Sequence, residues 1–149
     1  MNGKFDQNQL HLTDYPYPHM KFRIITLLAI IASFANGCSQ GKNKTSLPAM
    51  EFSKNIGQTT GAVVLDVRRP DEYKEGHLAN SLNINWNSNN FEAEVLKLDK
   101  TSPMYVYCLA GSRSASAAEK MRAIGFKQVY ELEGGISKWK AAKLPVTTQ

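Results

Sequence analysis

The chain has 149 residues, 42% of them hydrophobic, which is enough for one domain with a buried core plus short additional segments. Its 18 basic and 13 acidic residues leave a net charge of +5, milder than the dense basic patch of a nucleic-acid-binding protein, so we expect no nucleic-acid partner. With two cysteines, Cys38 and Cys108, the composition also excludes a scaffold built from several disulfides.

Residues 20–38 have the pattern of a secretory signal peptide. Lys21 and Arg23 form a positive flank, residues 24–34 are almost wholly apolar, and small residues lead up to Cys38. The apolar run is short for a membrane span. A buried core helix would explain the run but not its ordered flanks, so we predict a signal peptide.

Two polar stretches flank this segment. Residues 1–19 contain prolines and precede Met20, so we predict that they are a misassigned N-terminal extension and that translation starts at Met20. Residues 39–45 are polar without apolar periodicity, which predicts a flexible tether. The folded domain is then expected at residues 46–149.

The end of the signal segment, Ala35-Asn36-Gly37-Cys38, resembles the lipobox of bacterial lipoproteins. The resemblance implies cleavage before Cys38 and lipidation of its thiol. A single acyl chain holds a protein to a membrane only marginally, and lipoprotein processing supplies several. We therefore expect an extracytoplasmic protein that is lipid-anchored to a bacterial membrane and faces the periplasm.

Residues 46–149 alternate between helical and strand patterns. In chain order we expect a helix at 48–56, a strand at 62–67, a helical turn from Pro70, a short strand at 81–85, a helix at 91–98, a strand at 104–108, a helix at 114–124, a strand at 128–132 and a helix at 136–142. This alternation predicts an α/β domain with a mostly parallel sheet. Ligands of such sheets bind at the carboxyl ends of the strands, where Cys108 lies.

The segment after Cys108 is suited to holding a sulfur anion. Gly111 and Ser112 allow the backbone to curl so that successive N–H groups point at one spot, and the helix that follows adds its free N–H groups. Arg113 adds a permanent charge, and we expect the sulfur to face all of these groups. Such surroundings favour the thiolate and would equally stabilise a persulfide. The alternative is a buried core cysteine, which the glycine, serine and arginine after it disfavour.

Several motifs in the right order give residues 46–145 a resemblance to the rhodanese homology domain. The motifs are Leu65-Asp66-Val67-Arg68, Asp71-Glu72-Tyr73, Gly76-His77-Leu78, Ala79-Asn80-Ser81-Leu82-Asn83-Ile84, Tyr107-Cys108 through Arg113-Ser114, Gly125-Phe126, Val129-Tyr130, Leu132, Gly134-Gly135-Ile136 and Trp139. The resemblance implies a three-layer α/β fold with a central, mostly parallel sheet flanked by helices. It also implies a rhodanese-type sulfurtransferase with Cys108 as the catalytic residue.

The loop after the cysteine is the expected substrate-binding segment. It consists of Leu109, Ala110, Gly111, Ser112 and Arg113, with Ser114 in support. With Cys108 included, the segment from Cys108 to Arg113 has six residues. The resemblance implies that this length is typical of family members that transfer sulfur, whereas related phosphatases have one residue more. Leu109 departs from thiosulfate-using relatives, which often have a basic residue there, and this puts thiosulfate affinity in doubt.

Other polar residues near the site have mainly structural interpretations. Asp66 and Arg68 lie at the end of a strand, so they can support the loop after Cys108. The favoured interpretation is that they form a structural ion pair. His77 follows a glycine and is expected to have a loop role, and no other histidine or cysteine stands at metal-ligand spacing. Gly134-Gly135 predicts a tight turn before the last helix.

The expected reaction moves sulfane sulfur from a donor, thiosulfate or a persulfide, through a Cys108 persulfide to a thiol or cyanide acceptor, without a cofactor. A protein sulfur acceptor also fits. Three alternatives remain: a sulfur-carrier or sulfide-sensing module with a dedicated protein partner and little turnover, an arsenate reductase or phosphatase, and an inactive module. The loop length disfavours the second of these alternatives, and the presence of both Cys108 and Arg113 disfavours the third.

Overall fold

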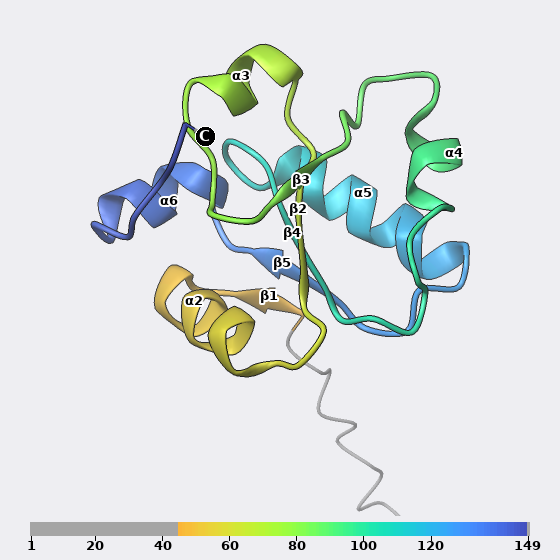
Figure 1. Ribbon diagram of the computed structural model, residues 1–149, viewed down its shortest axis with the longest axis horizontal. Coiled ribbons are helices and arrows are strands. Elements are labelled where there is room, and N and C mark those ends of the chain that lie inside the picture. The colour runs from red at the N-terminus through yellow and green to blue at the C-terminus, as the bar shows by residue number, and fades with distance from the viewer. Residues whose placement is uncertain (1–44, 149) are drawn as a thin grey trace, which may run out of the picture. The chain divides into compact units, whose positions relative to one another are not determined.

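The computed structural model describes residues 45–148, which form an α/β unit around a five-stranded sheet (Figure 1). In chain order the elements are β1 (Ser46–Leu47), α2 (Ala49–Gln58), β2 (Val63–Asp66), α3 (Pro70–Lys74), β3 (Leu82–Asn83), α4 (Phe91–Val95), β4 (Met104–Tyr107), α5 (Ser112–Ala123), β5 (Val129–Leu132) and α6 (Gly135–Ala141). The strands lie in the order β1-β5-β4-β2-β3, and the paired strands within residues 45–148 are parallel. The predicted fold class is confirmed.

Helices cover both faces of the sheet, so the unit has three layers (Figure 1). Successive side chains of a strand point to opposite faces, and β4 shows the consequence. Tyr105 and Tyr107 pack with α2 and α6, whereas Val106 packs with α4 and α5. Cys108 belongs to the same core cluster as Val106, so the residue after β4 is directed toward the α5 side.

The observed elements differ from the expected ones mainly at their ends. The two-residue strand β1 was not predicted, because Ser46 and Leu47 are too few to show a strand period, and their pairing with β5 defines the strand. Helix α5 begins two residues earlier than expected, at Ser112. It follows Gly111, which adopts a φ of 104° that is accessible mainly to glycine.

The ion pair expected between Asp66 and Arg68 is present at the end of β2. The guanidinium Nη2 lies 2.6 Å from the Asp66 carboxylate, and the two side chains expose 3% and 0% of their surface. Arg68 Nη2 also donates to the carbonyl oxygen of Gly76 at 2.7 Å. Burial alone would lower the pKa of Arg68, but the hydrogen bond and charge of Asp66 hold it above its ordinary value, so the guanidinium remains charged.

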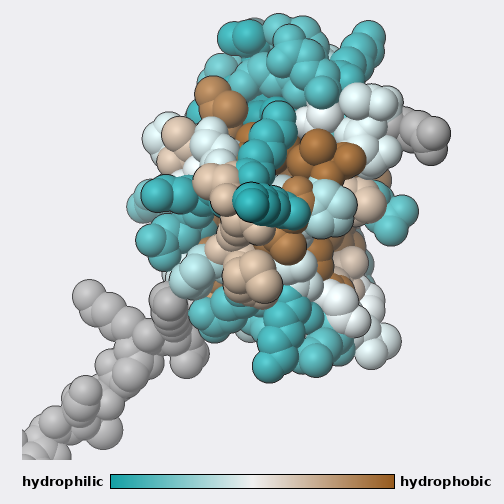
Figure 2. All heavy atoms as spheres, turned by 90° about the vertical axis from the view of Figure 1, so that its left-hand side faces the viewer, coloured by the Kyte–Doolittle hydropathy of each residue, from teal (hydrophilic) through white to brown (hydrophobic). Residues whose placement is uncertain are grey.

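The surface carries scattered apolar side chains. Figure 2 shows the face on the left of Figure 1, where apolar residues lie between larger hydrophilic areas. The large hydrophobic residues that are exposed are Met50, Leu82, Leu96, Leu109 and Val146. Single apolar residues are normal on protein surfaces and do not by themselves mark an interface. Leu109 is the one that adjoins Cys108 in the chain.

The predictions for the N-terminal part of the chain fall outside the described residues. These are the extension at 1–19, the signal peptide at 20–38 and nearly all of the tether at 39–45. Within residues 45–148, no helix is both long enough and apolar enough to cross a membrane.

Candidate active site

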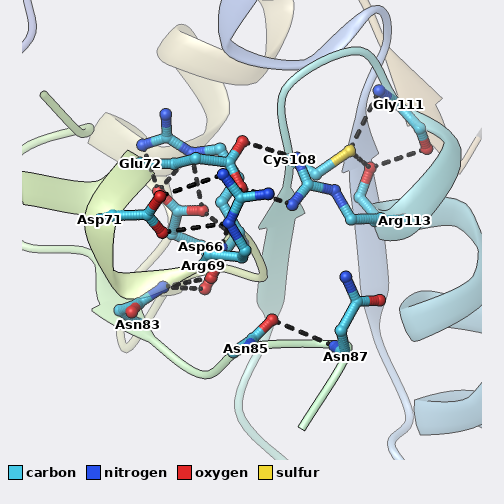
Figure 3. Close-up of polar contacts among 12 residues, drawn as sticks. Asp66, Arg69, Asp71, Glu72, Asn83, Asn85, Asn87, Cys108, Gly111 and Arg113 are labelled. Carbon is cyan, nitrogen blue, oxygen red and sulfur yellow. Dashed lines mark hydrogen bonds and ion pairs between the residues drawn. The ribbon is translucent and has the colours of Figure 1, made fainter. Parts of the chain in front are cut away.

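Cys108 lies directly after β4, at the carboxyl edge of the sheet, with β2 and β5 on either side of its strand. The residue exposes 1% of its surface. The chain then turns sharply through residues 109–111 and enters α5, so the loop curls around the sulfur (Figure 3). The position of the cysteine is the one predicted from the strand pattern.

The sulfur of Cys108 accepts hydrogen bonds from the loop and from α5. The Gly111 amide donates to Sγ at 3.1 Å, and the Ser114 hydroxyl lies 3.5 Å from it (Figure 3). Burial alone would raise the pKa of the Cys108 thiol. The Ser114 hydroxyl and the amides of Ser114, Gly111 and Ala110 outweigh burial, so the pKa lies below its ordinary value. These contacts favour a thiolate at neutral pH.

The back of the loop is held by the start of α6. The amides of Ile136 and Ser137 donate to the carbonyl oxygens of Cys108 and Leu109 at 2.8 and 3.1 Å. Gly135 makes this approach possible, because a Cβ at that position would lie 2.4 Å from the Cys108 oxygen. With its first two carbonyls bound on the α6 side, the loop can turn amides toward the sulfur. Gly134-Gly135 is thus more than the tight turn that the sequence predicted.

Arg113 has a carboxylate partner that the sequence did not predict. Its guanidinium forms two hydrogen bonds with Glu72 of α3, Nη1 to Oε2 at 2.7 Å and Nη2 to Oε1 at 2.8 Å (Figure 3). The hydrogen bonds from Arg113 lower the pKa of Glu72 to about 2, so the carboxylate stays ionised at physiological pH. In the sequence, Glu72 stood out only as part of the Asp71-Glu72-Tyr73 motif, and no local signal linked it to Arg113.

The remaining predicted site residues occupy three kinds of position. Leu109, Ala110 and Ser112 are exposed at the turn of the loop, where they can meet a ligand. Asp66 and Arg68 form the buried pair described above, at the end of the strand beside β4. His77 is buried and stacks on Tyr73 at a centroid distance of 3.7 Å, consistent with the structural loop role that was predicted. Among residues 45–148, no group of three potential metal ligands lies together.

Ser114→Ala should make Cys108 less reactive toward alkylating agents. Loss of the hydroxyl removes a group that lowers the thiol pKa, so less thiolate is present at neutral pH. We expect the iodoacetamide rate at pH 7 to fall roughly three- to tenfold, as one lost hydrogen bond of about 1 kcal/mol implies. The rate-against-pH curve should move to higher pH.

Ser116→Ala is the matched control, because Ser116 is an exposed serine of the same helix. Its alkylation curve should superimpose on that of the unmodified chain. Equal curves for Ser114→Ala and Ser116→Ala would show that the Ser114 hydroxyl does not stabilise the thiolate.

Most of the described region is similar to known proteins. Residues 49–142 match a family model described as a rhodanese-like domain. The chain is 43% identical over 79 residues to thiosulfate sulfurtransferase GlpE of Coxiella burnetii, covering 53% of this chain and 72% of that protein. It is 36% identical over 116 residues to the uncharacterized protein YqhL of Bacillus subtilis, covering 78% of this chain and 88% of that protein. A solved rhodanese-related protein from Thermoplasma volcanium matches with a TM-score of 0.63 at 33% identity, covering 70% of this chain and 98% of that one.

Proposed function

Because this chain belongs to the rhodanese-like domain family, we propose that it is a sulfurtransferase that carries sulfane sulfur as a persulfide on Cys108. The observation that carries the proposal is the environment of the thiol. Its sulfur accepts hydrogen bonds from the Gly111 amide and the Ser114 hydroxyl, inside a loop of the length expected for sulfur transfer. The proposal extends the match with curated thiosulfate sulfurtransferases to a specific residue and mechanism.

The proposed cycle has two transfers and regenerates the thiolate. With thiosulfate, the Cys108 thiolate attacks the outer sulfur, the donor S–S bond breaks and sulfite leaves with the bonding electrons. The enzyme then carries an anionic persulfide, which the loop amides and the Ser114 hydroxyl stabilise as they stabilise the thiolate. A thiol acceptor takes the outer sulfur as R–S–SH, or cyanide takes it as thiocyanate, and the thiolate returns. The atoms and electrons of the two transfers balance without a cofactor.

Intact-mass analysis tests the persulfide directly. We expect the purified chain to gain the mass of one sulfur atom after exposure to a sulfane-sulfur donor, thiosulfate or an organic persulfide, and fragmentation should place it on Cys108. Addition of cyanide should remove that mass and release thiocyanate. A chain that takes up no sulfur from either kind of donor would contradict the proposed function.

A second candidate is a sulfur-carrier or sulfide-sensing module that delivers to a dedicated protein. The position of Leu109, rather than its exposure, favours it, because a protein that accepts sulfur from Cys108 would meet this apolar neighbour of the reactive residue. Such a module would form the same persulfide on Cys108. It would differ by slow turnover with cyanide and small thiols, which steady-state thiocyanate assays measure.

We further propose that the protein is a periplasm-facing lipoprotein anchored through Cys38, on the basis of the lipobox-like segment before that residue. The mature chain should begin at Cys38 and partition with membranes. Cys38→Ser should leave the precursor unprocessed or release the protein from membranes, as measured by fractionation and N-terminal mass analysis. A chain that remains in the soluble fraction with residues 20–37 attached would contradict this proposal.

A further inference from the structure

The arginines near Cys108 are all paired with carboxylates. Arg113 forms two hydrogen bonds with Glu72 at 2.7 and 2.8 Å. Arg69 forms two with Asp71 at 3.0 and 3.1 Å. Arg68 is buried against Asp66, as described above. Figure 3 shows Asp66, Arg69, Asp71 and Glu72 beside one another, with the Arg113 side chain reaching toward Glu72. The three ion pairs contain three positive and three negative charges.

Two further anion-stabilising groups contact the cysteine sulfur. The Gly111 amide and the Ser114 hydroxyl already contact Sγ, so they stabilise one negative charge, that of the thiolate or of the persulfide. Thiosulfate brings two further negative charges to this thiolate. An uncompensated positive charge at the site would raise the rate at which a dianion reacts there, and the paired arginines do not supply such a charge.

Leu109 also disfavours a dianionic donor at the exposed side of the loop. It exposes 47% of its surface directly after the cysteine, so the loop presents an apolar, uncharged side chain to solvent at this position. An alkyl group can contact this side chain favourably, whereas a sulfonate would lose hydration there without gaining a charged partner. The paired arginines and the exposed Leu109 therefore both favour a donor with little charge and an alkyl group.

We propose that the sulfur donor is a weakly charged organic persulfide rather than thiosulfate, and that Glu72 sets this preference by neutralising Arg113. The inference rests on the proposed function and narrows its substrate class. The Cys108 thiolate attacks the outer sulfur of R–S–SH, the donor S–S bond breaks and a new S–S bond forms on Cys108. The sulfur that leaves as R–S⁻ takes the proton of the transferred outer sulfur and becomes R–SH. The enzyme persulfide is left anionic, and no oxidant or reductant is consumed.

The test is the rate at which Cys108 takes up sulfur from two donors. The purified chain is mixed with thiosulfate or with 2-hydroxyethyl persulfide at low and high salt, and persulfide on Cys108 is followed by mass spectrometry of the peptide that contains it. We expect faster uptake from 2-hydroxyethyl persulfide, by about tenfold or more, and a thiosulfate rate that changes little with salt. A dianion about 6 Å from one uncompensated charge in water would gain roughly a factor of ten, which sets the scale of the effect.

Two substitutions should restore the missing charge independently. Glu72→Gln frees the charge of Arg113, and Leu109→Arg adds a new charge at an exposed position where the fold tolerates it. Each should raise the thiosulfate rate by roughly tenfold and make it fall with salt, while the rate with 2-hydroxyethyl persulfide changes less. If Glu72→Gln fails to fold, Leu109→Arg still decides the result.

Glu94→Gln is the matched control for net charge. It removes one carboxylate from an exposed pair with Lys97 in and after α4, and it should leave both rates unchanged. Faster uptake from thiosulfate than from the persulfide by the unmodified chain would overturn the donor preference, and so would thiosulfate rates that neither substitution raises. A folded Glu72→Gln chain whose thiosulfate rate does not rise would overturn the role given to Glu72. Cys108 that takes sulfur from neither donor would overturn the proposed function itself.

Discussion

Cys108→Ser should reduce sulfur transfer to cyanide or thiols to the uncatalysed background. A serine hydroxyl is a far weaker nucleophile at neutral pH than a cysteine thiolate, and it cannot carry a persulfide. The substitution is nearly isosteric, and the Gly111 amide and Ser114 hydroxyl that contact Sγ remain available to the new oxygen. We therefore expect loss of activity without loss of fold, measured as thiocyanate production alongside thermal unfolding.

Cys38→Ser is the control that separates the two thiols. Its position lies in the segment proposed to anchor the protein, so its domain should keep the rate of sulfur transfer. If Cys108→Ser retained measurable turnover while Cys38→Ser abolished it, the reactive thiol would be that of Cys38 and not that of Cys108. A Cys108→Ser chain that is unfolded would be recognised by its loss of a cooperative thermal transition.

Asp66→Ala should destabilise the domain by about 3–5 kcal/mol, the range expected when one partner of a buried ion pair is removed. Arg68 would remain buried with the Gly76 carbonyl but without its carboxylate. The same region holds the end of β3, because the side-chain amide of Asn83 donates to the carbonyl oxygens of Asp66 and Arg68. Urea unfolding followed by circular dichroism measures the loss as a lower midpoint at a similar slope.

Asp71→Ala is the matched surface substitution, since Asp71 and Arg69 expose 64% and 57% of their side chains. An ion pair between exposed side chains contributes little to stability, so this variant should unfold close to the unmodified chain. A cost for Asp66→Ala no larger than that for Asp71→Ala would mean that the charge of Arg68 finds other compensation when its partner is lost.

The fold class and the reactive cysteine can be predicted from the sequence because both depend on short local patterns. β-rich runs end at Asp66 and at Tyr107, and helical patterns separate them, which is sufficient for a parallel α/β sheet. The loop of Cys108 is also local. Its glycine takes a φ of 104°, and the helix that supplies Ser114 starts at the next residue. Sequence proximity alone brings these groups around the sulfur.

The charge state of the site depends on contacts between distant segments. Glu72 and Arg113 are 41 positions apart, and they meet because the parallel arrangement of β2 and β4 brings α3 and the start of α5 to the same edge. The contact of Gly135 with the Cys108 carbonyl likewise depends on where α6 begins relative to the loop. No periodicity or motif encodes which carboxylate will neutralise an arginine. The sequence by itself therefore determined the α/β fold and pointed to Cys108 as the candidate nucleophile. Only the tertiary structure decided that Arg113 is held by Glu72, because long-range pairing follows from how the elements pack.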